Sequence, residues 1–412
     1  MGEGARKPSR VALALGASLA ALVLTGVMLK SSPHLSDRPF VWICLAWGSV
    51  AVALAMSWPR KPGFHKTALW NCGACLLILS AAELVFSRDR APKAGNARVQ
   101  KTYTDLQGEE VKTHVRHGVL GAGNAPGLTA RAVAMFGDEL VFDVVYSFDE
   151  NGWRRSAPSS DAPDAQELLF FGGSYMFGEG VQDKETLPSQ VGAALGGTYA
   201  VQNFGIVGAG PHQMLAAVES GLVAEALHGE PVAAVYLALP YHVSRVLGER
   251  PWCKHDPRYV LKNGQAVPAG HFDDPPGGGP VVRKIRNQLE KSHAWQALST
   301  MGHGRVTDRE IELTAAVVAR AREKLQEAYP SLAFHVLFWD DGGDVSDRLM
   351  AAMQTRKLQV HRVSEVLPGP VTGKGSGSYR IPHDGHPGPL AYRLLAEYVA
   401  AKIVDGDAGK DH

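Results

Sequence analysis

The chain has little cysteine and no excess of charge of either sign. Only four of its 412 residues are cysteines, and three of these lie in apolar stretches near the N-terminus. Cys253 is then alone in the rest of the sequence, which excludes a disulfide framework. Lysine and arginine number 42 against 41 aspartates and glutamates, so no overall field favours nucleic acid as a partner. The 16 histidines are scattered without metal-ligand spacing, and we expect no metal or other cofactor.

Long uncharged runs are present instead, and three of them dominate the first 90 residues. They cover about residues 11–29, 40–58 and 67–86, with short polar connectors between them. Each is long enough to cross a hydrocarbon core of ~30 Å as a helix. A cleaved signal peptide accounts for the first run only, so the three in succession predict three transmembrane helices. Cys72 and Cys75 form a C-x-x-C pair inside the third run, which we interpret as small packing residues because no second pair accompanies them.

Basic residues near these runs give a small orientation bias. One side of the membrane carries Lys7, Arg10, Arg60, Lys61 and Lys66, and the other carries Lys30, Arg38, Arg88, Arg90 and Lys93. The connectors close to the first two helices favour a cytoplasmic N-terminus. Three crossings then place the chain after about residue 90 outside the cytoplasm. We expect a multi-pass protein of a bacterial inner membrane.

Composition divides the chain at about residues 90 and 160. We expect a membrane region over 1–90, a linker with a small β-rich segment over 91–160, and an α/β domain over 161–412. The β-rich segment is indicated by "ELVFDVVYSFDENGW", in which β-branched and aromatic residues run into a turn. Residues 240–300 include the breaker-rich "HFDDPPGGGP" and predict an irregular insertion, either a lid or substrate loop or a plain connector.

The α/β domain is predicted from strands that alternate with helices. Five short apolar strands are expected, over 167–171, 198–203, 232–239, 332–339 and 358–363. Helices are expected over 213–229, 307–330 and 389–403, the second opening with Thr307 and Glu310 at capping-box spacing. This alternation is typical of a three-layer parallel α/β sheet. Ligands bind such sheets at the carboxyl ends of the strands.

A serine follows the first of these strands directly, in "LLFFGGSYMFGEGV". Gly172 and Gly173 allow a sharp turn, which would expose Ser174 at the strand tip beside a helix N-terminus. Serine is also a common turn and cap residue, so the motif alone does not decide between a nucleophile and a structural serine. A nucleophile requires a base and an oxyanion hole.

A candidate base lies near the C-terminus, in "YRIPHDGHPGP". His386 is placed to take the serine proton, and Asp384 to fix the tautomer of the imidazole and stabilise its protonated form. His383 is a second, weaker candidate base, and a solvated loop histidine is the structural alternative. The turn after the second strand, "NFGIVGAGP", supplies glycines for an oxyanion hole, with Asn203 either bracing that loop or donating itself. It lacks the G-x-G-x-x-G spacing of a dinucleotide site.

Taken together, three blocks resemble the SGNH, or GDSL-like, hydrolase superfamily. They are "FFGGSYMFGEGV", "NFGIVGAGP" and "DGHPG", and the resemblance covers about residues 165–403. It implies a flavodoxin-like sheet and a Ser-His-Asp triad that removes or transfers acyl groups, often acetyl, on carbohydrates and lipids. Carried over residue by residue, it implies Ser174 as nucleophile and first oxyanion donor, Gly208 as second donor, His386 as base and Asp384 as orienter.

The sequence departs from the family pattern at two places. The third block of the family usually carries an Asn that completes the oxyanion hole, whereas "LALPYHVSR" has none. Either Tyr241 or His242, which occupy that region, donates instead, or the hole is weaker. The usual Asp-x-x-His is Asp-x-His here, a spacing that also resembles extracytoplasmic relatives acting on polysaccharides. We therefore expect a membrane-anchored serine esterase or acyltransferase whose substrate is an acylated glycan or lipid. The alternative is a non-catalytic binding or assembly protein with a membrane or polysaccharide-assembly partner.

Overall fold

The computed structural model describes residues 98–162, 164–274, 305–371 and 376–404, together with the isolated positions 48, 51, 71 and 78. Apart from these four positions, the three expected transmembrane helices lie outside the described residues, as do their orientation and the end of the expected insertion. Within the described ranges no helix is both long and apolar enough to cross a membrane. The chain divides into two compact units, and the one described below comprises residues 97–274 and 306–412.

A five-stranded parallel sheet forms the centre of this unit, as the sequence predicts. Its spatial order is β12-β11-β8-β6-β7, with every neighbouring pair parallel. The strands are β6 (Glu167–Gly172), β7 (Ala200–Gly205), β8 (Pro231–Ala238), β11 (Ala333–Phe338) and β12 (Gln359–Arg362). Numbered along the chain this is the order 2-1-3-4-5, the flavodoxin-like doubly wound arrangement. The strand order reverses at β6, between β7 and β8.

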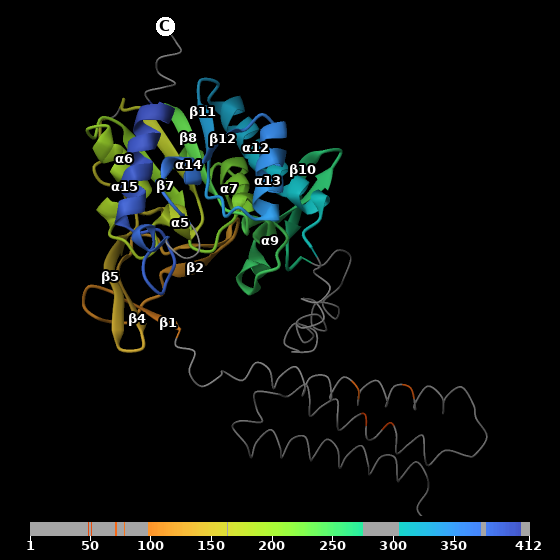
Figure 1. Cartoon of the computed structure of the whole chain (residues 1–412), viewed down its shortest axis with the longest axis horizontal. Helices are drawn as coiled ribbons and strands as arrows, with labels where there is room; N and C mark the ends of the chain where they lie inside the picture. Colours follow the sequence, from red (N-terminus) through yellow and green to blue (C-terminus); the bar gives the residue numbers. More distant parts are fainter. Residues whose placement is uncertain are drawn as a thin grey trace, which may run out of the picture. The chain divides into compact units, whose positions relative to one another are not determined.

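Two hydrophobic cores, one on each face, make the unit three-layered. Leu168 and Phe170 of β6 belong to one core, and Leu169 and Phe171 to the other, as the alternation of side chains along a strand requires. The first face is covered by α6 (Leu187–Ala194) and α15 (Pro389–Tyr398), and the second by α7 (Pro211–Glu219), α12 (Asp308–Ala328) and α13 (Asp344–Thr355) (Figure 1). Shorter helices are α5 (Ser174–Phe177), α8 (Leu222–Glu225), α9 (His242–Val246) and α14 (Val363–Val366).

Helix boundaries follow local signals with one exception. The predicted capping box is present, because Thr307 Oγ1 accepts from Glu310 N–H at 3.4 Å and Glu310 Oε2 accepts from Thr307 N–H at 2.7 Å. The single helix expected over 213–229 is instead two, α7 and α8. They are separated at Gly221, whose φ of 85° is left-handed and cannot continue a right-handed helix. The last helix ends in a π-helical stretch, Val399–Val404.

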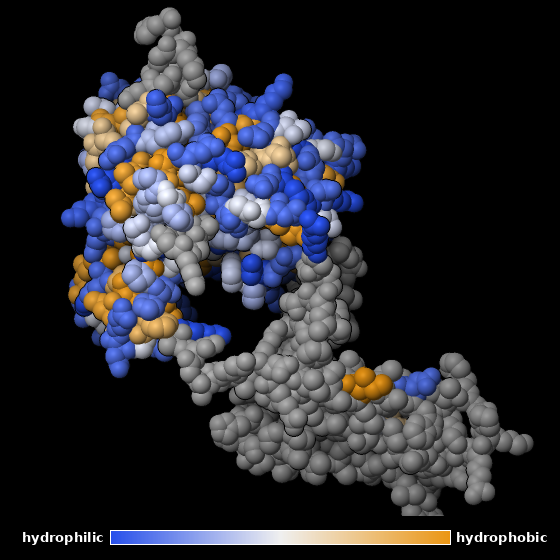
Figure 2. Space-filling model, viewed as in Figure 1, coloured by the Kyte–Doolittle hydropathy of each residue, from blue (hydrophilic) through white to orange (hydrophobic). Residues whose placement is uncertain are grey.

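The segment before the sheet is β-rich, as expected, and packs on the domain. An antiparallel sheet has the order β1-β4-β5, with β1 at Val99–Thr104, β4 at Thr129–Phe136 and β5 at Glu139–Ser147. A two-stranded pair joins β2 (His114–His117) and β3 (Gly121–Asn124). Phe142 and Tyr146 of β5 lie in the same hydrophobic core as α6 and α15. Figure 2 shows a mostly polar visible face for the unit, with hydrophobic residues around the β4–β5 hairpin, where Leu140 is 55% exposed.

The described part of the 240–300 insertion is regular rather than irregular. After α9 come a 3₁₀ turn, Pro251–His255, and an antiparallel hairpin of β9 (Pro257–Lys262) and β10 (Gln265–His271). The turn of the hairpin is Asn263-Gly264, with φ angles of 52° and 74°. Such an Asn-Gly pair closes a two-residue hairpin, and this is the sequence signal that reveals it. The hairpin packs against α12.

Candidate active site

Ser174 stands at the carboxyl end of β6, an inner strand of the sheet. β6 ends at Gly172, and Ser174 is the first residue of the short helix α5, with only 4% of its surface exposed. β6 lies between β7 and β8, where the strand order reverses, which is the position at which doubly wound sheets open a crevice for ligands. The fold therefore brings a buried serine to the edge of the sheet where a ligand site is expected.

The three residues of the predicted triad lie in contact, although Ser174 precedes His386 by 212 residues. Ser174 Oγ is 2.8 Å from His386 Nε2. His386 Nδ1 forms a very short hydrogen bond with Asp384 Oδ1, which also accepts from the His386 backbone N–H at 3.3 Å. With Nδ1–H held by the carboxylate, Nε2 is left as the acceptor for the serine hydroxyl. The arrangement is therefore that of nucleophile, base and orienter.

Backbone and arginine contacts fix the loop that carries the histidine. Arg380 Nη1 donates to Gly385 O, the carbonyl between Asp384 and His386, and to Tyr175 Oη at 2.7 Å. Its Nη2 donates to Val371 O at 2.8 Å. The Ile381 N–H donates to the His386 carbonyl at 2.8 Å, and this backbone hydrogen bond closes the loop. The imidazole is thus held on a rigid support, as a catalytic group requires.

Two further charged residues, which the sequence analysis missed, complete the site. Lys101 of β1 places Nζ 2.6 Å from Glu179 Oε1 and 2.7 Å from Asp384 Oδ2. Glu179, in the loop after α5, places Oε2 3.2 Å from His386 Nε2. Glu179 lies in the quoted "FGEGV" of the serine block, but its role depends on a lysine that no local pattern marks. The β-rich segment therefore contributes a side chain to the site.

These contacts shift the pKa values of the groups that make them. Burial opposes the charge of Lys101, but the carboxylates of Glu179 and Asp384 outweigh it, and the pKa of the ammonium is raised. Burial likewise opposes the charge of Asp384, but His386 and Lys101 outweigh it and hold the pKa of this carboxyl well below its ordinary value. Both groups are therefore charged at neutral pH.

The alternative base, His383, faces away from the serine toward the β4–β5 hairpin. Its ring stacks on Phe136 with centroids 4.1 Å apart, and its Nε2 lies 3.2 Å from Glu139 Oε2. Nothing in these contacts connects His383 with Ser174. Its place in the structure is that of a contact between the loop that carries Asp384 and His386 and the β4–β5 hairpin.

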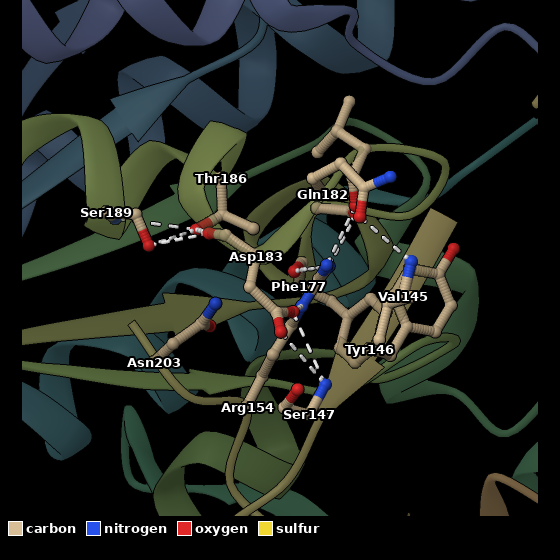
Figure 3. Close-up of polar contacts among 12 residues, drawn as sticks. Val145, Tyr146, Ser147, Arg154, Phe177, Gln182, Asp183, Thr186, Ser189 and Asn203 are labelled. Carbon is tan, nitrogen blue, oxygen red and sulfur yellow. Dashed lines mark hydrogen bonds and ion pairs between the residues drawn. The ribbon is translucent and has the colours of Figure 1, made fainter. Parts of the chain in front are cut away.

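A buried arginine supports the chain that follows the serine (Figure 3). Arg154 is 1% exposed. Its guanidinium donates to Phe177 O at 2.7 Å, Gly178 O at 2.6 Å and Val181 O at 2.8 Å, and its Nε pairs with Asp183 Oδ1 at 2.9 Å. The carbonyls at the end of α5 are thereby satisfied without water. The same loop carries Glu179, so its path is set by Arg154.

The glycine loop after β7 contains a residue in the left-handed conformation. Gly208 has a φ of 84°, a left-handed conformation that glycine adopts without strain. Its carbonyl accepts from Trp252 Nε1 at 3.2 Å, and the indole is 54% exposed. Asn203 braces the strand end, because its Oδ1 accepts from Gly205 N–H at 3.0 Å. The Asn203 Nδ2 group is buried without a hydrogen-bond partner among the described residues.

His242 occupies the region where the family pattern has Asn. Its Nδ1 lies 2.6 Å from Tyr236 Oη, while its Nε2 is buried and has no partner within the described ranges. Nε2 is 3.5 Å from the position that a Cβ on Gly173 would take, next to the serine. Burial, and then the charge of Arg245, lowers the pKa of His242 well below its ordinary value, and burial raises that of Tyr236 well above. Both side chains are therefore neutral.

Tyr241, the other residue expected to stand in for that Asn, directly precedes α9. It is 37% exposed, and the guanidinium of Arg245 lies over its ring at 4.9 Å. Among the described residues, no group of three or more histidine, cysteine, aspartate or glutamate side chains is arranged to hold a metal ion.

Comparisons with known proteins give distant structural likenesses only. No family model and no curated protein matches the chain. A solved structure of a protein assigned to the G-D-S-L family of lipolytic proteins, from Desulfitobacterium hafniense, is similar at 12% identity and a TM-score of 0.31, over 57% of this chain and 98% of that one. An acetyl xylan esterase from the rumen bacterium Butyrivibrio proteoclasticus is similar at 11% identity and a TM-score of 0.35, over 76% of this chain and 84% of that one. At this identity and TM-score, neither likeness carries an argument about the family, the activity or the substrate of this chain.

Proposed function

We propose that the domain is a serine esterase or acyltransferase of the SGNH type. The observation that carries the proposal is a pair of contacts to one imidazole. Ser174 Oγ lies 2.8 Å from His386 Nε2, and His386 Nδ1 is hydrogen-bonded to the carboxylate of Asp384. A surface serine that caps a turn has no need of a histidine held by a buried carboxylate. Triads are recognised by this geometry and not by sequence position.

In the proposed reaction, Ser174 Oγ attacks the acyl carbonyl while His386 Nε2 takes its proton. Backbone N–H groups of Ser174 and Gly208 stabilise the tetrahedral oxyanion. His242 Nε2 supplies a third donor if Tyr236 donates to Nδ1, since that tautomer leaves Nε2 protonated. His386 then returns the proton to the leaving alcohol. The acyl-enzyme passes its acyl group to water or to a sugar hydroxyl.

We propose an acylated glycan or lipid outside the cytoplasm as the substrate, with acetyl as the acyl group. The exposed indole of Trp252, which donates to Gly208 O, and the 37% exposed Tyr241 offer aromatic faces, which suit the face of a sugar ring. The three apolar N-terminal runs would anchor the enzyme in the membrane and provide a surface for an assembly partner. A protease-protection assay on spheroplasts tests this location. If the domain lies outside the cytoplasm, added protease should digest it.

The first experiment is labelling of the full chain with a fluorophosphonate probe. Wild type should label, while Ser174→Ala and His386→Ala should not, because an unactivated serine reacts too slowly. His383→Ala is the matched control for the second variant, since it removes the neighbouring histidine that does not face the serine, and it should label. A folded wild type that fails to label would instead favour the non-catalytic binding or assembly protein.

A further inference from the structure

A lysine from the first strand of the β-rich segment is inserted between two carboxylates of the active site. Lys101 Nζ contacts Glu179 Oε1 at 2.6 Å and Asp384 Oδ2 at 2.7 Å, and its side chain is only 22% exposed. It also lies 5.6 Å above the ring of Phe142. The two carboxylate groups are themselves 6% and 3% exposed. A charge held this deeply requires a partner, and here one ammonium serves two carboxylates.

The two carboxylates lie on opposite sides of one imidazole. Asp384 contacts His386 Nδ1, while Glu179 Oε2 lies 3.2 Å from Nε2, the same nitrogen that contacts Ser174 Oγ. A triad needs only the first carboxylate. The second one adds negative charge on the side where the proton is exchanged, and each carboxylate favours the protonated imidazole.

We propose that Lys101 is a positioning residue of the triad, which fixes Asp384 and Glu179 on either side of His386 and offsets part of their charge. This inference rests on the proposed serine chemistry and deepens it. Without the ammonium, two uncompensated carboxylates would hold the proton on His386 and delay its action as a base to higher pH. Without Glu179 the opposite follows, because the imidazole would give up its proton more readily.

Three tyrosines and one histidine around this cluster are neutral near pH 7. Burial raises the pKa of Tyr103 on β1 to about 12 and that of Tyr146 on β5 further, while it lowers the pKa of His114 on β2. Tyr392 of α15 is fully buried with a strongly raised pKa. Arg380, the other cation of the catalytic loop, donates to backbone carbonyls and to Tyr175 Oη. The charge that the imidazole meets is therefore set chiefly by Lys101, Glu179 and Asp384.

The test is the rate of fluorophosphonate labelling of the full chain as a function of pH. For Lys101→Met we expect the acidic limb of the profile to move to higher pH, with labelling about tenfold slower at a pH on that limb, the factor of one pH unit. For Glu179→Gln we expect a shift to lower pH. The double variant should return toward the wild-type limb, and Lys101→Arg should keep it. Lys112→Met, which removes an exposed lysine of the same segment, should leave rate and limb unchanged.

The signs of the shifts separate positioning from loss of structure. A merely structural lysine would lower the rate at every pH and leave the limb in place, and that result would overturn the proposal. Shifts of the same sign in Lys101→Met and Glu179→Gln would overturn it as well. If Lys101→Met fails to fold by circular dichroism, the direction of the Glu179→Gln shift decides. A wild type that does not label refutes the serine chemistry itself, whereas a labelling wild type with unshifted variants refutes only the role of Lys101.

Discussion

Replacement of Arg154 by methionine should destabilise the domain strongly. The side chain is 1% exposed and makes four polar contacts, three with carbonyls and one with Asp183. Its guanidinium also lies over the rings of Tyr146 and Phe177, at 4.4 and 4.6 Å. Methionine keeps much of the apolar contact but leaves the carbonyls without donors (Figure 3).

The magnitude follows from what is left unpaired. A hydrogen bond to a charged group contributes about 1.5–3 kcal/mol, and removing one partner of a buried ion pair costs about 3–5 kcal/mol. These terms overlap, and Asp183 keeps 23% of its side-chain surface in water, so we expect a loss of about 4 kcal/mol in the free energy of unfolding. At about 2–4 °C per kcal/mol for a domain of this size, the melting temperature should fall by about 8–16 °C.

The assay is thermal unfolding of the full chain, followed by tryptophan fluorescence, for which the neighbouring Trp153 is a buried reporter. Arg155→Met is the matched control. Its side chain is 60% exposed and pairs only loosely with Glu150, at 3.7 Å, so the free energy of unfolding should change by less than about 0.5 kcal/mol. Equal melting temperatures for the two variants would refute the reasoning, because they would mean that the buried contacts contribute no more than the surface pair.

Two further predictions concern the oxyanion hole and the buried carboxylate. His242→Ala should lower the rate of fluorophosphonate labelling about 10²- to 10³-fold. His242→Asn, which supplies an amide N–H, should lower the labelling rate less. Equal rates for wild type and His242→Ala would exclude His242 as a donor. Asp384→Asn should destabilise the fold at pH 7, and the difference in melting temperature from wild type should shrink as the pH falls below about 4. The sign follows because the pKa of Asp384 is lower in the folded than in the unfolded chain, so its stabilisation is present above the unfolded value and disappears as the pH falls through the folded one. A difference that does not change between pH 7 and pH 3 would contradict this.

Local patterns in the sequence were enough to predict the sheet, most helix ends and the proximity of Ser174, His386 and Asp384. Buried parallel strands are short apolar runs, and the capping box at Thr307 is a contact between residues three apart. Ser174, Asp384 and His386 could be proposed because each stands in a glycine- or proline-rich turn directly after a strand or before a helix. Such turns bring side chains to the same edge of a parallel sheet wherever they lie in the chain.

Only the tertiary structure decided which charges surround the triad. Lys101 lies in a strand in which exposure alternates, and Arg154 is followed directly by another arginine, Arg155. Nothing in the local sequence therefore distinguishes either position from that of a solvent-exposed side chain. In the folded chain, Lys101 is buried against Glu179, and Arg154 is buried against backbone carbonyls at and after the end of α5. Both are contacts between segments that are distant in the sequence. Buried charge is stabilised by the partners that folding brings to it, and that pairing has no period, cap or turn to mark it in the sequence.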